Sequence, residues 1–394
     1  MRRVARVSGF LALLLGAGCS IPPALVAPLG TFPPLSQVDG ALGTRSSAAV
    51  PAALKIGLAV AESDVAVAVH AAASAGDVAL APGKTYVARR AGAKIVLAEG
   101  QTEVLRADPP LEIRSDAAVG LGFGGRRYRG SFQLIAPPGG GGGVTLINAV
   151  PPEDYLYGVL PAEMATGWLI EALKAQAVAA RTYAIANLGR RAALGFDLYD
   201  TTADQVYKGF TIEKPDTNSA VDGTRGQVLT WQERPIAAFF HASSGGETDD
   251  AVAVWGQDLP YIQGVVDLDP SPHARWSASF DAGTLGSAIA ALGSGVGTLQ
   301  GLTVSKTTPH GRARWLEARG TAGTATVDAN ALRMKLGLKS TRYLLTREGA
   351  GYKFAGGGWG HGLGMSQWGA RAYAQQGEGY QAILARYYAD TTLK

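Results

Sequence analysis

The chain has 394 residues, of which 47% are hydrophobic and 17% are charged, so it can bury a sizeable core in one large domain or in two or three smaller ones. Its 36 Lys and Arg residues against 32 Asp and Glu residues give a net charge of +4. That small, unclustered excess would tolerate an anionic polymer but gives no support for nucleic-acid binding. The 53 glycines and 20 prolines favour a β-rich protein with many turns and long loops.

The N-terminus has the pattern of an export signal, which we assign to residues 1–19. Three arginines in the first six residues precede an apolar stretch, residues 7–17, that is too short to span a bilayer comfortably. The segment Leu-Gly-Ala-Gly-Cys resembles a bacterial lipobox, which implies cleavage before Cys19 and a diacylglycerol on its sulfur. Gly16 is a less usual residue in that motif, so cleavage by an ordinary signal peptidase stays open. Cys19 is the only cysteine, so the mature chain has none for disulfides or thiolate metal ligands.

Two segments of different character follow the signal. Residues 20–50 are rich in Pro, Ala, Ser and Gly without a clear period and are predicted to be a flexible tether. Residues 51–150 are predicted to be an N-terminal β-rich module, because short apolar or alternating runs are bounded by turn residues. Residues 120–125 formally match G-x-G-x-x-G, but they precede a strand pattern rather than a helix, which argues against a dinucleotide site.

The clearest helix begins near Ile170, with Thr166 as its predicted N-cap. Apolar side chains recur there at the spacing of one helical face: Ile170, Leu173, Ala177, Ala180, Ala184 and Leu188. Gln176 and Arg181 fall off that stripe, and Tyr183 borders it.

The rest of the chain returns to short elements. Residues 200–345 read as short strands and loops, and residues 281–300, rich in Gly, Ala and Ser, as a small inserted helix and loop. A short helix ending near Gly377 and a last helix follow at the C-terminus. We therefore predict an α+β fold: β-rich modules around one long helix, with a helical C-terminus and a groove between them.

Four segments stand out as places where chemistry could sit: 150–183 with Pro-Ala-Glu-Met, 200–209 with Asp-Gln-Val-Tyr, 238–256 with His-Ala-Ser-Ser-Gly-Gly-Glu, and 358–370 with Gly-Trp-Gly-His-Gly-Leu-Gly-Met-Ser-Gln-Trp-Gly-Ala. Together, in this order and at this spacing, they resemble the SpoIID/LytB family, the stage II sporulation protein D group of peptidoglycan lytic transglycosylases and amidase enhancers. The resemblance runs from about Ala53 to Lys394, and residues 151–394 are predicted to be the SpoIID-like catalytic core.

The resemblance implies that Glu163, in Pro-Ala-Glu-Met, is the catalytic acid/base. We predict that Glu163 lies on a loop before the helix and that crowding by Leu160, Met164 and Trp168 raises its pKa. It would protonate the glycosidic oxygen between N-acetylmuramic acid (MurNAc) and N-acetylglucosamine (GlcNAc). The C6 hydroxyl of MurNAc would then attack C1 of the same sugar and leave a 1,6-anhydroMurNAc end. Because the sugar supplies the nucleophile, one carboxylate suffices. A Glu163 that merely caps a helix is the structural alternative.

Further residues of the four segments are candidates for binding substrate or supporting Glu163. Each also has a structural interpretation, as an ion pair, a turn residue or part of the core. The candidates are Gln176, Arg181, Tyr183, Gln205, Tyr207, His241, Ser244, His361 and Gln367. Amide and hydroxyl groups among them suit sugar hydroxyls and acetamides. Three tryptophans could stack on sugar rings or pack in the core: Trp255, Trp359 and Trp368.

The resemblance also bears on cofactors and partners. Some family members bind zinc near the histidine that corresponds to His241, with cysteines following it; these cysteines are absent here, so we expect no metal and no other cofactor. We expect peptidoglycan glycan strands as substrate, a cell-wall amidase as a further partner, no nucleic acid, and membrane contact only through a lipid on Cys19. The protein would then be exported to the cell envelope and face the periplasm or cell wall. The alternative function is a non-catalytic wall-binding protein that enhances an N-acetylmuramoyl-L-alanine amidase.

Overall fold

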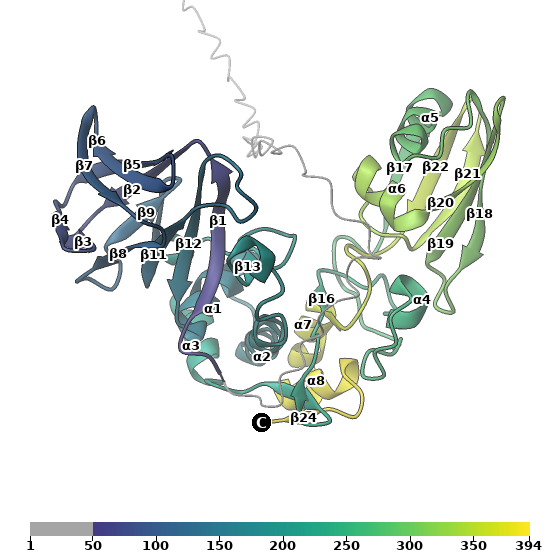
Figure 1. Ribbon diagram of the computed structural model, residues 1–394. Coiled ribbons are helices and arrows are strands. Elements are labelled where there is room, and N and C mark those ends of the chain that lie inside the picture. The colour runs from purple at the N-terminus through teal and green to yellow at the C-terminus, as the bar shows by residue number, and fades with distance from the viewer. Residues whose placement is uncertain (1–49) are drawn as a thin grey trace, which may run out of the picture. The chain divides into compact units, whose positions relative to one another are not determined.

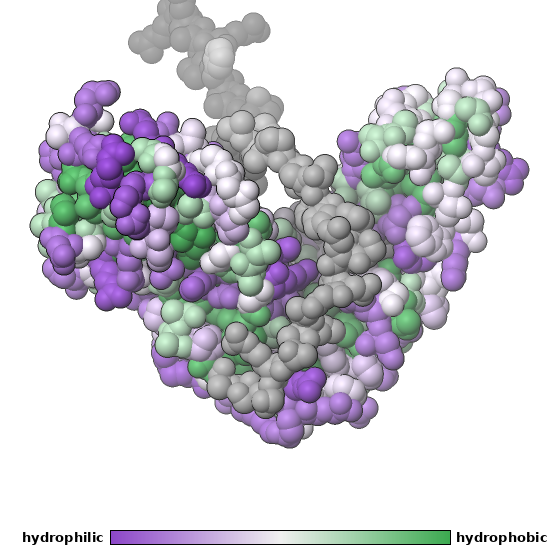
Figure 2. Space-filling model, in the orientation of Figure 1, coloured by the Kyte–Doolittle hydropathy of each residue, from purple (hydrophilic) through white to green (hydrophobic). Residues whose placement is uncertain are grey.

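The computed structural model describes residues 50–394, which form a mixed α and β structure (Figure 1). The predicted signal peptide, Cys19 and nearly all of the predicted tether lie outside the described residues. Within residues 50–394, no helix combines the length and apolar character needed to cross a membrane. Hydrophilic and hydrophobic residues are interspersed on the face of the molecule that Figure 2 shows.

Two sheets build the first part of the described chain. Their strands are β1 (Leu54–Glu62), β2 (Asp64–Val69), β3 (Ala73–Ala75), β4 (Val78–Leu80), β5 (Lys84–Ala91), β6 (Lys94–Glu99), β7 (Thr102–Ala107), β8 (Leu111–Ser115), β9 (Leu121–Phe123), β10 (Arg126–Tyr128), β11 (Ser131–Ile135), β12 (Val144–Val150) and β13 (Leu198–Tyr199). One sheet has the order β13-β1-β12-β11-β8-β3-β4 and the other β10-β9-β2-β5-β6-β7. Side chains of β11 alternate between buried and half-buried, whereas β12 is buried almost throughout, because β12 is a central strand that also contacts β2 and β5 of the second sheet.

Helices α1 (Pro152–Glu163) and α2 (Ile170–Ala186) follow β12 directly. Pro152 occupies the start of α1, where the absent N–H costs no hydrogen bond. α2 packs against α1, α3 (Pro215–Asp222), α7 (Gln367–Gln375) and α8 (Tyr380–Tyr387). It is therefore buried on nearly all sides, and its many alanines allow the close approach of these four neighbours.

Two local predictions about this region were wrong. Glu163 is the last residue of α1 and does not lie on the loop before α2. Thr166 does not cap α2: the N-cap residue is Leu169, which makes no capping side-chain hydrogen bond. Sequence periodicity located α2 but missed α1, because Pro161 lies inside α1 and disguises its last turn.

The third and fourth of the four segments meet through short pairings. The elements are α4 (Ala251–Trp255), β14 (Leu229–Trp231), β15 (Arg234–Pro235), β16 (Phe240–His241), β23 (Met365–Ser366) and β24 (Thr392–Leu393). β16 and β23 run parallel, with Phe240 opposite Met365 and His241 opposite Ser366. This pairing places the start of α7, and with it Gln367, beside the segment that carries His241.

A second hydrophobic core lies within residues 276–354. It is built by β17 (Trp276–Asp281), α5 (Ala282–Ala291), β18 (Leu299–Thr307), β19 (Ala313–Gly320), β20 (Gly323–Asp328), α6 (Ala329–Leu336), β21 (Tyr343–Glu348) and β22 (Gly351–Gly356). The strands form two three-stranded antiparallel sheets, β17-β22-β21 and β18-β19-β20. Residues 281–300 form α5 and the start of β18 and so contribute to this core.

Candidate active site around Glu163

Glu163 is the last residue of α1, and protein atoms surround its side chain closely. The residue is nevertheless partly exposed to solvent. Its Oε1 accepts a hydrogen bond from the backbone N–H of Val206 at 3.1 Å, and its carboxyl is also hydrogen-bonded by the Gln367 side chain. Burial raises the pKa of Glu163 above its usual range, while Val206, Gln367 and the charge of Lys208 act in the opposite direction. The C-terminal end of a helix also disfavours a negative charge.

The second segment reaches Glu163 because it lies directly against α1. The backbone N–H of Lys208 donates to the carbonyl of Gly158 at 3.1 Å. A Cβ atom on Gly158 would lie 2.6 Å from the Tyr207 ring, so only glycine permits this approach at that position. The close packing holds the N–H of Val206 at the carboxyl of Glu163.

The fourth segment reaches Glu163 through the start of α7. Ser366 caps α7 by accepting from the N–H of Gly369 at 3.1 Å, which fixes Gln367 in the first turn. Gln367 contacts Glu163 and also donates through Nε2 to Oε1 of Gln176 at 3.5 Å. Gln176 is fully buried, and its Nε2 has no partner among the described residues. Three predicted residues, Glu163, Gln176 and Gln367, therefore form one hydrogen-bonded chain.

Of the two interpretations of Arg181, the structure shows the ion pair; the predicted role in binding substrate or supporting Glu163 was wrong. It is fully buried and forms a two-point ion pair with Glu153, at 2.6 and 3.0 Å, in the first turn of α1. It also donates to the carbonyl oxygens of Val221 and Gln227. Arg181 therefore joins α1, α2 and α3 inside the protein.

Gln205 and Tyr207 are internal as well, which corrects their prediction as sugar-binding residues. The Gln205 amide accepts from the Tyr155 hydroxyl at 3.2 Å and donates to the carbonyl of Ala180 at 3.2 Å. The Tyr207 hydroxyl donates to Oδ1 of Asn148 at 2.9 Å, and the residue is fully buried. The second segment serves the site through the backbone of Val206 instead.

The predicted Tyr183 and Ser244 also have internal partners. The Tyr183 hydroxyl lies 3.4 Å from Oδ1 of Asp204 and accepts from Arg190 at 3.0 Å. The Ser244 hydroxyl accepts from the N–H of Gly246 at 3.1 Å and is fully buried. Both residues brace loops rather than face Glu163.

The rings of the two predicted histidines lie next to each other at a tilt of 56°, with centroids 5.4 Å apart. His361 uses both ring nitrogens, toward the carbonyl of Phe240 at 3.0 Å and the N–H of Leu363 at 3.1 Å. His241 contacts the carbonyl of Leu363 through Nδ1, and its Nε2 has no partner among the described residues. Burial lowers the pKa of His361 to about 3 and also lowers the pKa of His241, so both rings are neutral at physiological pH. Neither is placed to act as the acid.

Comparison with known proteins places this chain in a family. A profile described as "Stage II sporulation protein" matches residues 140–231, which include α1, α2 and the Val206 loop. The chain is 33% identical over 257 residues to stage II sporulation protein D of Bacillus amyloliquefaciens, covering 61% of this chain and 74% of that protein. The chain belongs to the SpoIID family. This confirms the family resemblance that the four segments indicated.

Two other relatives widen the comparison. An uncharacterized protein of Brachyspira hyodysenteriae is 34% identical over 271 residues, 68% of this chain and 73% of that protein. The amidase enhancer of Bacillus subtilis is 33% identical over 288 residues, 60% of this chain but 40% of that longer protein. A second profile, described as a domain of unknown function (DUF8618), matches residues 266–364 and includes the second hydrophobic core. The SpoIID profile and the second core thus occupy separate parts of the chain.

Three side chains, one in the loop before α2 and two in α7, form a cluster that the sequence analysis did not predict. The rings of Trp168 and Trp368 meet edge to face at 5.1 Å, and the guanidinium of Arg371 lies over both rings. Trp368 directly follows Gln367, and Trp168 lies five residues after Glu163. Arg371 gave no signal in the sequence beyond its spacing, one helical turn after Gln367.

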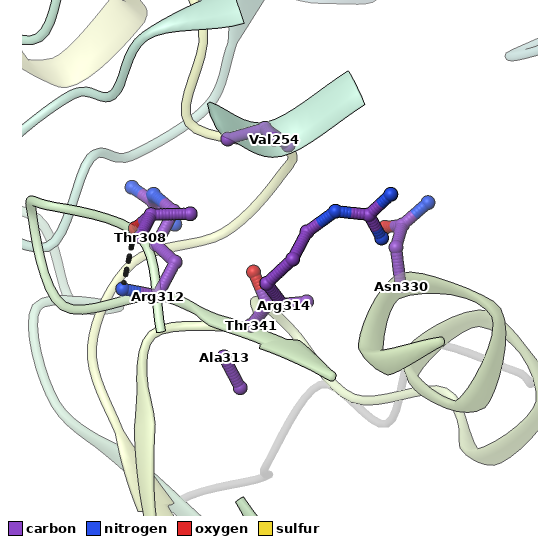
Figure 3. A pocket seen from close by; sticks show the side chains of 7 residues that line it. All are labelled: Val254, Thr308, Arg312, Ala313, Arg314, Asn330 and Thr341. Atoms are coloured by element: carbon purple, nitrogen blue, oxygen red, sulfur yellow. Dashed lines mark hydrogen bonds between the residues drawn. The ribbon is translucent and has the colours of Figure 1, made fainter. Parts of the chain in front are cut away.

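A separate polar region joins the second core to the SpoIID segments. Ligand atoms of Asp249, Asp250 and His310 lie within 4.8 Å of one another, a spacing that could hold a cation. Asp249, however, already accepts hydrogen bonds from Thr308 and from the N–H of Asp250. Fully buried Arg312 lies 3.9 Å from it. Arg312 and Thr308 also line a small pocket, shown in Figure 3 with Val254, Ala313, Arg314, Asn330 and Thr341.

The Arg312 side chain ties the second core to the third segment. Its Nη2 donates to the carbonyl of Ser244 at 2.7 Å and to that of Glu247 at 3.1 Å. A Cβ on Gly362 would lie 2.1 Å from the guanidinium carbon, so the glycine-rich loop passes directly over it. This region therefore has a structural role in positioning the two glycine-rich segments.

Proposed function

We propose that this protein is a peptidoglycan lytic transglycosylase in which Glu163 is the acid and then the base. The observation that carries the proposal is the environment of one carboxyl group: half-exposed, crowded enough to raise its pKa, and held by a backbone N–H and an amide rather than by an arginine. Such a carboxyl can keep its proton at a pH where an ordinary glutamate is ionised, as a general acid requires.

The chemistry needs no second carboxylate. Protonated Glu163 gives its proton to the oxygen between MurNAc and GlcNAc as the bond from that oxygen to C1 of MurNAc breaks. The C6 hydroxyl of the same MurNAc attacks C1, and its proton passes to the Glu163 carboxylate. The acid is thereby restored, a 1,6-anhydroMurNAc end forms and no water is consumed. Val206 and Gln367 would stabilise the carboxylate between the two steps.

In this proposal the glycan would lie over the end of α1 and the starts of α2 and α7. Leu169 and Ile170 are 48% and 40% exposed there, although both are large apolar residues. Trp168 and Trp368 are half-exposed beside them. An apolar and aromatic surface next to an acid suits the faces of sugar rings.

The test is digestion of purified glycan strands, free of stem peptides, followed by mass spectrometry. Wild type should release fragments one water lighter than hydrolytic products, and Glu163→Gln should release none. Glu103→Gln serves as the matched control. It removes an exposed carboxylate on β7 that is paired with Arg106. Products with ordinary reducing ends would instead show a muramidase.

A second candidate function rests on the likeness to the amidase enhancer. In that case the protein binds the wall and stimulates an amidase without cleaving glycan. Wild type would then bind glycan strands and release nothing, and Glu163→Gln would bind and stimulate an N-acetylmuramoyl-L-alanine amidase equally well. That pair of results would remove the enzymatic proposal and leave the wall-binding one.

We further propose export to the cell envelope with a lipid on Cys19, from the signal and lipobox pattern alone. Labelling of cells with a fatty-acid probe tests the anchor. Wild type should be labelled and Cys19→Ala should not. An unlabelled wild-type protein would remove the lipid anchor but would leave export, which fractionation of the cells tests separately.

A further inference from the structure

The cluster of Arg371, Trp168 and Trp368 presents a cation on the helix that also carries Gln367, and this cation has no counter-charge among residues 50–394. The guanidinium carbon lies 4.7 Å from the ring centroid of Trp368 and 5.2 Å from that of Trp168. All three side chains are half-exposed. The two rings, which meet at 5.1 Å, hold the guanidinium from the protein side. Its planar face is therefore fixed while hydrogen-bond donors remain free for a ligand.

Comparison with the other stacked arginines shows that this arrangement is unusual in the chain. Within residues 50–394, four other arginines lie over aromatic rings, and each also has a carboxylate partner: Arg129 with Glu213, Arg191 with Asp204, Arg314 with Asp328 and Arg386 with Glu378. Among the described residues, Arg371 has neither an ion pair nor a hydrogen bond. Carboxylates thus neutralise four of the five stacked guanidinium groups, and the guanidinium of Arg371 can bind a ligand.

The position of Arg371 links it to the proposed acid. Gln367 and Arg371 lie four residues apart on α7, so their side chains share one face, with Cβ atoms about 5–6 Å apart. The Gln367 side chain on that face contacts Glu163. Since Gln367 contacts Glu163, a glycan bound there would meet Arg371 one helical turn of α7 beyond Gln367, within reach of a neighbouring sugar or of a substituent on the same sugar.

We propose that Arg371 forms a carboxylate-binding subsite that recognises the acidic group carried by muramic acid residues. Arginine binds carboxylates through two parallel hydrogen bonds, and a guanidinium already oriented by stacking loses less freedom on binding. Of the two sugars in the glycan, MurNAc carries the carboxylate, either as its free lactyl group or on a stem peptide attached there, and GlcNAc carries none. Arg371 would thus fix which sugar lies on which side of Glu163. This inference rests on the proposed function.

The test measures binding rather than cleavage, in a Glu163→Gln background that prevents turnover. Three tetrasaccharides of alternating GlcNAc and MurNAc serve as probes: one with free lactyl carboxylates, one with these groups converted to neutral methylamides, and one bearing stem tetrapeptides. A charged probe should bind about tenfold more tightly than the neutral one or better, the usual range for a hydrogen bond to a charged group. The charged probe that shows the preference identifies the source of the carboxylate.

Adding Arg371→Gln should abolish the affinity ratio between charged and neutral probes, and Arg371→Lys should restore part of it. Arg386→Gln is the matched control, because Arg386 also stacks on a ring but is paired with Glu378, and its ratio should stay as in the parent. An unchanged ratio in Arg371→Gln, or equal affinities for all three probes in the parent, would overturn the subsite. A carboxylate preference in a wild-type protein that cleaves no glycan would keep the subsite and remove the proposed enzyme; cleavage without the preference would do the reverse.

Discussion

Helix α1 carries a glutamate at each end, and the two have opposite environments. Glu153, in the first turn, is buried against Arg181, which donates to both of its oxygens, and it also accepts from the N–H of Gly226. Glu163, in the last turn, has no arginine partner among the described residues; it has one backbone N–H, one amide and partial exposure. The helix dipole adds to the contrast, because it favours a carboxylate at the N-terminus and disfavours one at the C-terminus. The same residue type is thus a structural anion in one place and a candidate acid in the other.

The largest expected effect comes from removing the candidate acid. Glu163→Gln should lower the rate of glycan cleavage by about 100- to 10,000-fold, the usual contribution of a general acid or base. Initial rates on stripped glycan strands measure this.

The stability of Glu163→Gln should not fall along with its cleavage rate. The pKa of Glu163 is raised in the folded protein above its ordinary value of 4.5, so the folded state binds more protons than the unfolded state as pH rises above that value. The carboxyl therefore subtracts stability above about pH 4.5, and Glu163→Gln should be at least as stable as wild type at pH 7. A clear fall in the unfolding midpoint at pH 7 would mark Glu163 as structural.

Breaking the ion pair at the other end of α1 should have the largest effect on stability. Arg181→Ala leaves Glu153 buried without its partner and should lower the free energy of unfolding by about 3–5 kcal/mol, measured by denaturant titration. Arg225→Ala, which removes an exposed pair with Asp222, should cost about 1 kcal/mol or less. A stable Arg181→Ala protein that lacks only activity would contradict the contrast between the two glutamates.

A smaller change should tune the acid without removing it. Gln367→Leu deletes a hydrogen bond that lowers the pKa of Glu163, so the pKa should rise further and the alkaline limb of the pH–rate profile should move to higher pH. The rate at the optimum should fall by about tenfold, the cost of one hydrogen bond to a charged group. Gln375→Leu, at the exposed end of α7, should leave the limb in place; equal profiles for both variants would exclude contact between Gln367 and the acid.

The last and smallest effect concerns Tyr207 in the second segment. It distinguishes a role of this residue in stability from a role in binding glycan. Tyr207→Phe removes the hydroxyl that donates to Asn148 and should cost about 1–2 kcal/mol of stability without changing the cleavage products or the affinity for glycan. Thermal unfolding and binding assays measure the two quantities. Tyr199→Phe is a fitting control, since the Tyr199 hydroxyl has no hydrogen bond among the described residues. Weaker glycan binding by Tyr207→Phe at unchanged stability would return Tyr207 to the substrate surface.

The family resemblance pointed to Glu163, Gln176 and Gln367, and the structure brings these three side chains into contact. The sequence left Arg181 open between a substrate-binding role and an ion pair, because on a helix buried on nearly all sides a residue that leaves the apolar stripe need not be exposed. Gln205 and Tyr207 were misassigned for a related reason: their polar atoms suit sugars and buried hydrogen bonds equally well, and only the contacts with Ala180 and Asn148 distinguish the two.

What the sequence could not supply was pairing between distant segments. The contribution of Val206 is a backbone N–H, which every residue but proline offers, and it reaches Glu163 only because Gly158 lets the loop pack against α1. Arg371 carried no pattern of its own. Its stacking on Trp168 depends on the packing of α7 against α2, a contact between residues about 200 positions apart.

A carboxyl titration of Glu163 itself tests most directly whether this residue can act as the acid. Carbon-13 labelling of glutamate side chains, with Glu163→Gln used to assign the resonance, gives the pKa by NMR. We expect a midpoint above 4.5, the ordinary value from which burial raises the pKa of this carboxyl. A midpoint at or below 4.5 would show that Glu163 is held as a carboxylate, like a structural anion, and would contradict its role as the acid.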